Sequence, residues 1–176
     1  HLIKGTTLAQ IFDTYFRNPQ WQTEITKGLN AWEAQMRYEF YPGALDLLHD
    51  LKRNGVKCAV VTSSNIPKME SVRRQIEHFD ALFDKVLTAE DFAASKPAPD
   101  CYLLGAKVFG ADIDECVVFE DAYTGLQAGM DSGIFTIGIT TGHTREEMAD
   151  RCNYVIESYE GLTYEGLVRI LGENFV

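Results

Sequence analysis

The stretch VFEDAYTGLQAGMDSG, residues 118–133, decides the fold class of this 176-residue chain. An apolar run ends in two adjacent carboxylates, Glu120 and Asp121, and small residues follow at once at helical spacing. A buried strand that passes directly into a helix is typical of a parallel α/β sheet. Asp121 could cap the helix, but two adjacent acids exceed what a cap requires. Because like charges repel, the pair predicts a bound cation or a basic partner at this strand end.

The same alternation of strands and helices continues on both sides of this stretch. Four further apolar runs predict strands at residues 56–62, 85–89, 134–140 and 153–158. These runs are apolar throughout rather than at every second residue, so both faces of the sheet are expected to be covered by helices. The fold class is therefore α/β, with a Rossmann-like doubly wound parallel sheet. Such sheets bind ligands beyond the carboxyl ends of their strands.

The first 40 residues differ from the rest of the chain because they contain no run of the strand type. Their apolar residues recur at helical spacing over residues 8–16 and 21–40. We therefore divide the chain into a small helical domain, residues 1–40, and an α/β core domain, residues 41–176.

Composition limits the possible partners and the compartment. A net charge of -10 argues against non-specific nucleic-acid binding, which needs a basic face. No apolar run is long enough to cross a bilayer, and no signal peptide opens the chain. The four cysteines are scattered without a CxxC pair, as in reduced thiols. We expect a cytoplasmic monomer that binds neither nucleic acid nor membrane.

Polar residues follow two other predicted strands. Thr62, Ser63 and Ser64 end the run 56–62, where hydroxyls and N–H groups could cradle an anion or cap the next helix. Lys96 lies in a KPAP loop, and its prolines could fix the ammonium as a positioned charge. Taken alone, Lys96 could equally be a solvated surface lysine.

The order and spacing of these signals resemble the haloacid dehalogenase superfamily, from Tyr41 onward. The branch that resembles this chain most contains β-phosphoglucomutase and phosphoglycolate-phosphatase-like enzymes. Thr62 matches the strand-terminal Thr or Ser of the second motif, and Lys96 matches the lysine of the KPxP-like third motif. Glu120 and Asp121, followed by GLQAGMDSG, match the fourth motif.

The resemblance implies a role for each of these residues. The family binds Mg²⁺, so Asp121 is the expected direct ligand, with Glu120 helping directly or through water. Thr62 and the N–H groups of Ser63 and Ser64 would hold phosphoryl oxygens, and Lys96 would balance the charge of the nucleophile and the phosphate.

Residues 1–40 resemble the rear part of the family's inserted helical cap. The stretch IKGTTLAQI looks like the cap segment that faces the active site. Lys4, Thr6 and Thr7 are therefore candidate substrate contacts. For Thr6 and Thr7, a loop and a helix N-cap explain the same residues equally well.

The family's nucleophile has no counterpart in this chain. The family uses an Asp in a DxDGT-type motif at the end of the first core strand, and no predicted strand end here carries that motif. We expect a preceding N-terminal segment of about 40–60 residues to supply this Asp and the first core strand. The sheet would then show a gap without that strand, and the chain alone would be inactive unless the segment stays bound.

Three functions are compatible with this pattern. The leading one is a Mg²⁺-dependent phosphatase acting on a small phosphorylated metabolite such as a sugar phosphate. A β-phosphoglucomutase-like phosphomutase is the second, although Leu8 stands where the mutase pattern favours an arginine. The third is a non-catalytic fragment or binding module, against which the retained Thr62, Lys96, Glu120 and Asp121 argue.

Overall fold

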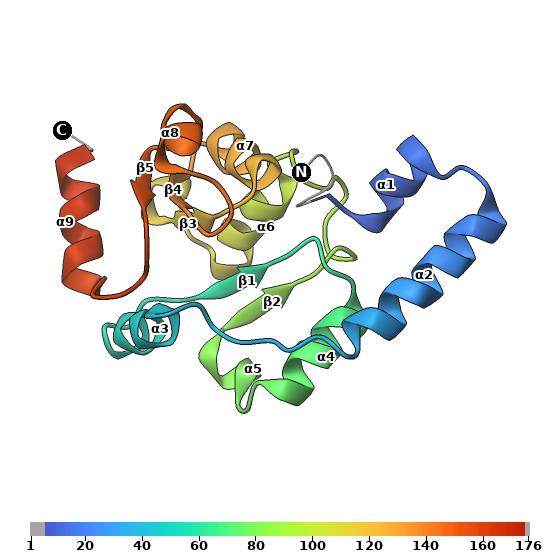
Figure 1. Ribbon diagram of the computed structural model, residues 1–176. Helices are drawn as coiled ribbons and strands as arrows, with labels where there is room; N and C mark the ends of the chain where they lie inside the picture. The colour runs from blue at the N-terminus through green and yellow to red at the C-terminus, as the bar shows by residue number, and fades with distance from the viewer. Residues whose placement is uncertain (1–5, 175–176) are drawn as a thin grey trace.

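The computed structural model describes residues 6–174 of the chain (Figure 1). Its strands are β1 (Ala59–Val61), β2 (Lys85–Leu87), β3 (Val117–Glu120), β4 (Phe135–Ile139) and β5 (Tyr154–Ile156). Its helices are α1 (Leu8–Tyr15), α2 (Pro19–Glu33), α3 (Ala44–Arg53), α4 (Ile66–Gln75), α5 (Phe79–Leu82), α6 (Asp100–Phe109), α7 (Tyr123–Ser132), α8 (Arg145–Met148) and α9 (Tyr164–Asn174). Short 3₁₀ turns, η1 (Ile113–Glu115) and η2 (Ala149–Arg151), precede β3 and β5. The predicted α/β fold is confirmed.

The five strands are parallel, as predicted, but they form two sheets instead of one. β1 pairs with β2, and β4 lies between β3 and β5. Among the described residues, no strand pairs with the remaining edge of β1 or of β3. All five residues of β4 are buried, whereas all three residues of β1 are only half-buried. The interruption expected from the sequence thus lies between β1 and β3.

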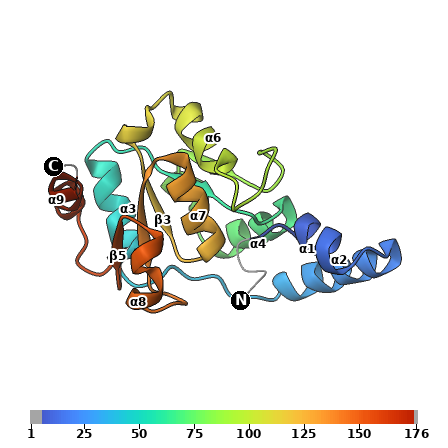
Figure 2. The ribbon, with the colours of Figure 1, turned by 90° about the horizontal axis from the view of Figure 1, so that it is seen from above.

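Helices cover both faces of the β3–β4–β5 sheet. Figure 2 shows α3 and α7 on opposite sides of β3. On the first face, α3 and α9 pack on alternate residues of β4; the buried members of this cluster are Leu47, Leu51, Phe135, Ile137, Ile139, Ile156 and Leu167. On the second face, α6 and α7 pack on Val118 of β3, and Val61 of β1 joins the same cluster. The α6 helix therefore contacts both sheets.

The small residues of α7 allow this helix to lie close to the sheet. A Cβ atom at Gly125 would collide with the carboxylate of Glu120, and one at Gly129 would collide with the side chain of Thr136. Ala128, between them, is fully buried. The Gly/Ala pattern after the acidic pair therefore makes room for the side chain of Glu120 beneath the helix.

The helices α1 and α2, called here the cap helices, extend away from the core (Figures 1 and 2). No side chain within either helix is buried, and the structure describes both helices in full. Trp21 and Trp32 are 60% and 61% exposed. In residues 6–174, no helix has the length and apolar character needed to cross a membrane.

One predicted helix ends earlier than the apolar periodicity indicates, and α4 is separated from α5 by a short break. The helix expected over 21–40 ends at Glu33, and beyond this end the side-chain amide of Gln75 in α4 binds the backbone of Met36 and Tyr38. The α4 helix ends at Gln75 because the next residue, Ile76, is extended with φ of -102° and ψ of 105°, and α5 begins after His78, whose φ of 58° is left-handed. The strands are also shorter than the apolar runs that predicted them.

Candidate active site

Lys96 contacts the carboxyl ends of β1 and β3, the two strands that border the interruption between the sheets. Its side chain is 5% exposed. The ammonium donates to the carbonyl oxygen of Val61, at the end of β1, over 3.3 Å, and it forms an ion pair with Glu120, the last residue of β3. Its carbon stem comes from the loop between β2 and α6, in which the Lys96–Pro97 peptide bond is cis. This lysine is therefore a buried, positioned charge.

Glu120 is held by hydrogen bonds at both carboxylate oxygens. Oε1 accepts from Lys96 and, over 2.7 Å, from the hydroxyl of Tyr102. Oε2 accepts from the backbone N–H groups of Asp121 and Ala122, over 2.9 and 3.1 Å. The basic partner predicted for the acidic pair is thus Lys96, which forms an ion pair with Glu120.

Asp121 is oriented by the loop that follows β4. The hydroxyl of Thr141 donates to Oδ2 of Asp121 over 2.9 Å. The carboxyl ends of β1, β3 and β4, together with the Lys96 loop, therefore meet at one place, which we call the carboxyl edge. This is the position at which parallel α/β sheets bind ligands.

The turn after β1 is held by its own side chains. Thr62 continues the pairing with β2, because its N–H donates to the carbonyl of Leu87 over 2.9 Å. Its hydroxyl oxygen accepts from the N–H of Ser64 over 3.0 Å, and Asn65 then caps α4. Thr62 follows Val61 directly, so it lies one residue from the carbonyl that binds Lys96. Phosphate binding by Thr62, Ser63 and Ser64 stays a prediction.

The start of α1 lies against the Lys96 loop. Thr7 caps α1 in a capping box with Gln10, and its side chain is buried. The hydroxyl of Ser95 donates to Thr7 over 3.3 Å, and the side-chain amide of Gln10 donates to the carbonyl of Lys96 over 3.2 Å. Thr7 thus serves as a cap and as a contact between the cap helices and the core.

The substrate contacts expected for the cap stay predictions. Lys4 lies outside the described residues. Thr6 and Thr7 precede α1, at its end next to the carboxyl edge.

The carboxylates at this edge influence the ionisation of two tyrosines. Burial, followed by the charge of Glu120, raises the pKa of Tyr102 well above its ordinary value. Burial, followed by the charges of Asp121 and Glu120, raises the pKa of Tyr159 to about 12. Both phenols are therefore protonated at neutral pH, and Tyr102 acts as a hydrogen-bond donor to Glu120.

The oxygen atoms at this edge are of the type that Mg²⁺ prefers. Asp121 offers a carboxylate that accepts from the hydroxyl of Thr141, and both oxygens of Glu120 accept from protein donors. Within residues 6–174, no group of three or more His, Cys, Asp and Glu side chains converges to form a metal site. Asp121 therefore fits Mg²⁺ as part of a site that bound phosphate, water and further ligands would complete.

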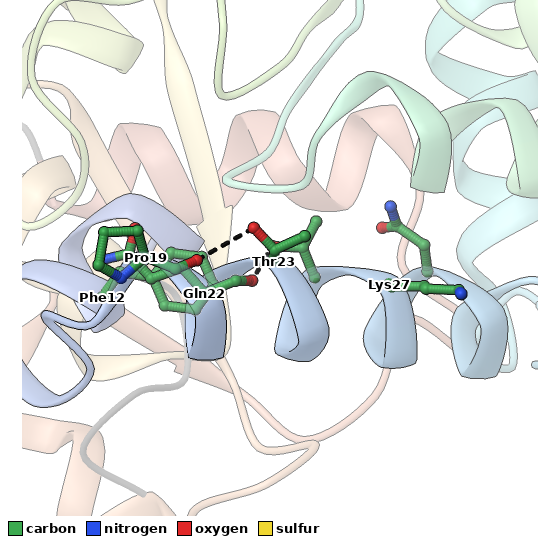
Figure 3. Close-up of a pocket in the computed structure, with 7 residues that line it drawn as sticks. Phe12, Pro19, Gln22, Thr23 and Lys27 are labelled. Carbon is green, nitrogen blue, oxygen red and sulfur yellow. Dashed lines mark hydrogen bonds between the residues drawn. The ribbon is translucent and has the colours of Figure 1, made fainter.

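Of two hollows in the part of the chain that the structure describes, the smaller one borders the carboxyl edge. A groove of about 630 Å³ lies on the cap helices, between Phe12 and Lys27, and includes none of the predicted site residues (Figure 3). A smaller hollow of about 340 Å³ lies at the ends of β4 and β5, and Thr141 and Tyr159 line it. Because Thr141 also binds Asp121, the smaller hollow borders the carboxyl edge.

Sequence reasoning missed two residues of this site, Tyr102 and Gln10. A weak signal for Tyr102 existed, since it is a polar-tipped aromatic residue in the first turn of the helix that follows the KPAP loop. Gln10 stands three residues after Thr7, where it completes a capping box, so the local pattern gave no sign of its second contact with Lys96.

The fold and the carboxyl edge define a parallel α/β enzyme core with a helical extension and a buried lysine beside two carboxylates. The chain belongs to the haloacid dehalogenase-like hydrolase family, whose profile matches residues 1–139. It is 31% identical over 163 residues to hexitol phosphatase A of Escherichia coli, an alignment that covers 93% of this chain and 70% of that protein. It spans between 10% and 60% of the other curated relatives that it matches here.

Solved structures share the fold at lower identity. A haloacid dehalogenase hydrolase of family IA, variant 3, from Entamoeba histolytica superimposes with a TM-score of 0.82 and 24% identity, covering 97% of this chain and 81% of that one. A β-phosphoglucomutase from Clostridium difficile gives a TM-score of 0.80 and 19% identity, covering 98% and 80%. At these identities the two structures establish the fold.

Proposed function

We propose that this chain is part of a Mg²⁺-dependent phosphatase that hydrolyses a small phosphorylated metabolite such as a sugar phosphate. One observation carries the proposal: the ammonium of Lys96 is buried between the ends of β1 and β3, where it binds the carbonyl of Val61 and pairs with Glu120, the residue before Asp121. A phosphate dianion needs positive charge that is already in place, because phosphoryl transfer depends on positioning and charge neutralisation. The similarity to a hexitol phosphatase supports a sugar or polyol phosphate as the substrate.

Each residue of the carboxyl edge has a distinct role in this proposal. The hydroxyl of Thr62 donates a hydrogen bond to a phosphoryl oxygen, and Lys96 neutralises negative charge on the phosphate. Asp121, oriented by Thr141, would hold Mg²⁺. When bound, Mg²⁺ supplies further positive charge to the phosphoryl oxygens. Glu120 keeps Lys96 in place through their ion pair.

The proposed nucleophile is the aspartate of a DxDGT-type motif, and that motif does not occur in these 176 residues. Within residues 6–174, no strand pairs with the second edge of β1 or of β3, which supports a further parallel strand between them that carries this aspartate. Its carboxylate oxygen would bond to phosphorus while the ester bond to the alcohol breaks and the alcohol leaves with a proton from an acid. Water would then hydrolyse the aspartyl phosphate, releasing inorganic phosphate and restoring the carboxylate.

Leu8 favours a phosphatase over a phosphomutase. It is the first residue of α1, next to Thr7, which contacts the Lys96 loop. The mutase pattern favours an arginine at this position, and a guanidinium group is suited to binding an additional phosphate. An uncharged leucine suits a substrate that carries one phosphate.

The test is a phosphate-release assay on the natural protein that contains these residues. A panel of sugar and polyol phosphates is incubated with Mg²⁺ or with a chelator, and free phosphate is measured. Asp121→Asn is compared with Asp131→Asn, which changes an exposed aspartate of α7. We expect Asp121→Asn to lower the rate by about 10²–10³-fold, the size of effect that follows loss of one charge-stabilising group, and Asp131→Asn to leave it unchanged.

Other outcomes separate the alternatives. A phosphomutase would convert one sugar phosphate into another and release little free phosphate. Absence of both activities across the panel, with the protein folded and Mg²⁺ present, would favour a binding module and contradict the proposal.

A further inference from the structure

The buried ion pair of the carboxyl edge has a third member, Tyr102. This residue lies in the first turn of α6 and is 6% exposed. Its hydroxyl donates to Oε1 of Glu120 over 2.7 Å, and the nitrogen of Lys96 lies 4.7 Å from the centre of its ring. A single side chain therefore contacts both the cation and the anion of the pair.

The hydroxyl of Tyr102 completes the hydrogen bonding of Glu120. A carboxylate has about four acceptor positions, and the structure shows four donors here: Lys96, Tyr102 and the N–H groups of Asp121 and Ala122. With all four present, the carboxylate cannot rotate without breaking a hydrogen bond. The hydroxyl thus fixes the oxygen atom to which Lys96 is paired.

The ring of Tyr102 places a favourable surface beside Lys96. An ammonium within about 6 Å of the centre of an aromatic ring is attracted by its π-electrons, more strongly when water is excluded. The same ammonium donates to the carbonyl of Val61. The ring, the carbonyl and Glu120 surround the nitrogen from three elements, α6, β1 and β3.

We propose that Tyr102 is a positioning residue of this site, which holds Lys96 through its ring and Glu120 through its hydroxyl. Its effect on turnover rests on the proposed function, whereas its effect on Lys96 does not. The competing explanation is packing alone, since Tyr102 also lies in the buried cluster with Cys101, Ala106 and Val118. The two explanations differ in what happens to Lys96 when only the hydroxyl is removed.

The experiment measures how fast Lys96 is acetylated by limiting acetic anhydride at one fixed pH. Peptide mass spectrometry gives the rate at Lys96 relative to that at Lys107, an exposed lysine of α6. Tyr102→Phe removes the hydroxyl and keeps the ring, whereas Tyr102→Leu removes both. Val118→Ala is the matched control, because it loosens the same cluster without touching either charge.

The proposal predicts how the relative acetylation rate of Lys96 should rank in the wild type and the three variants. Tyr102→Phe should raise the relative rate of Lys96 by about tenfold, as expected for one lost hydrogen bond to a charged group. Tyr102→Leu should raise it by about a further three- to tenfold through loss of the ring contact. Val118→Ala should stay within about threefold of the wild type, because it removes packing alone.

Two results would overturn the positioning role: a Tyr102→Phe rate equal to that of the wild type, or a Val118→Ala rate equal to that of Tyr102→Leu. Because acetylation needs no turnover, these results stand whether or not the protein releases phosphate. A protein without phosphatase activity whose Lys96 still follows the predicted order would refute the proposed function alone.

Discussion

The helices α7 and α2 differ in what holds them in position. Five of the ten residues of α7 are buried, and its glycines allow side chains of β3 and β4 to lie directly beneath it. None of the fifteen residues of α2 is buried. The position of α7 is therefore set by packing, which acts along its whole length.

The cap helices are instead attached to the core at their two ends by polar contacts. At the start of α1, Thr7 and Gln10 bind the Lys96 loop. At the end of α2, Glu33 forms an ion pair of 3.0 Å with Lys68 of α4. Such contacts contribute less free energy than a buried apolar face. The same kind of substitution should therefore lower the free energy of unfolding more in the core than in the cap helices.

The largest difference is expected for the two ion pairs. Lys96→Met leaves Glu120 buried without its cation, which should lower the free energy of unfolding by about 3–5 kcal/mol. Lys68→Met removes the partner of Glu33 at the junction of the cap helices and the core; these side chains are 28% and 17% exposed, so the loss should be about 1 kcal/mol, the upper end for a pair that water still reaches. Urea unfolding of the two variants measures both values. Equal losses would show that the Lys96 pair is not desolvated as described.

Leucine truncations compare the packing of the two helices. Leu126 of α7 is fully buried, and Leu126→Ala should lower the free energy of unfolding by about 2–5 kcal/mol through the cavity that it leaves. Leu29 of α2 is 36% exposed, and Leu29→Ala should change it by less than about 0.5 kcal/mol. Thermal and urea unfolding give both numbers. A large loss for Leu29→Ala would mean that this face of α2 is covered in solution.

The core was more predictable from the sequence than the cap because its signals are local. The apolar run of β3, the adjacent acids and the Gly/Ala spacing of α7 lie within sixteen consecutive residues. Parallel strands bring their carboxyl ends to one edge, so Lys96 could be expected near Glu120 from the chain order alone.

The contacts that could not be predicted from the sequence are those between segments far apart along the chain. The hydroxyl of Tyr102 reaches Glu120 across 18 positions, which depends on how α6 is rotated against β3. Beyond the end of α2, the carbonyl of Met36 is bound by Gln75, 39 positions away. Helical periodicity over residues 21–40 carries no information about a competing side-chain amide on another helix.

The raised pKa of Tyr159 predicts how the stability of the core depends on pH. Its pKa is raised to about 12 by burial and by the charges of Asp121 and Glu120, so the folded state favours the neutral phenol. The stability from this preference is present in full below pH 10, the ordinary pKa, and is lost between pH 10 and pH 12. A shift of this size corresponds to about 2–3 kcal/mol.

Replacing Tyr159 by Phe should therefore flatten the alkaline dependence of the free energy of unfolding and remove one late step from the ultraviolet titration of tyrosinate. Tyr15→Phe, an exposed tyrosine of α1, serves as the control and should leave the late step of Tyr159 in place. Persistence of that step in Tyr159→Phe would assign it to another residue.

The smallest effect is expected at the contact between α1 and the Lys96 loop. Gln10→Ala removes the hydrogen bond to the carbonyl of Lys96 and the capping contact with the N–H of Thr7. Each neutral hydrogen bond contributes about 1 kcal/mol, so the loss of two should make local opening of α1 roughly thirtyfold more frequent while global unfolding changes little. Hydrogen exchange of the α1 amides, resolved by mass spectrometry, measures this opening.

Gln22→Ala is the matched control for this contact, because the amide of Gln22 binds the carbonyl of Phe16 within the cap helices. It should speed exchange at the turn between α1 and α2 and leave the amides of the Lys96 loop unchanged. Gln10→Ala should instead speed exchange on both sides of its contact, in α1 and around Ser95. If the two variants give the same pattern, the cap helices are held to the core by contacts other than Gln10.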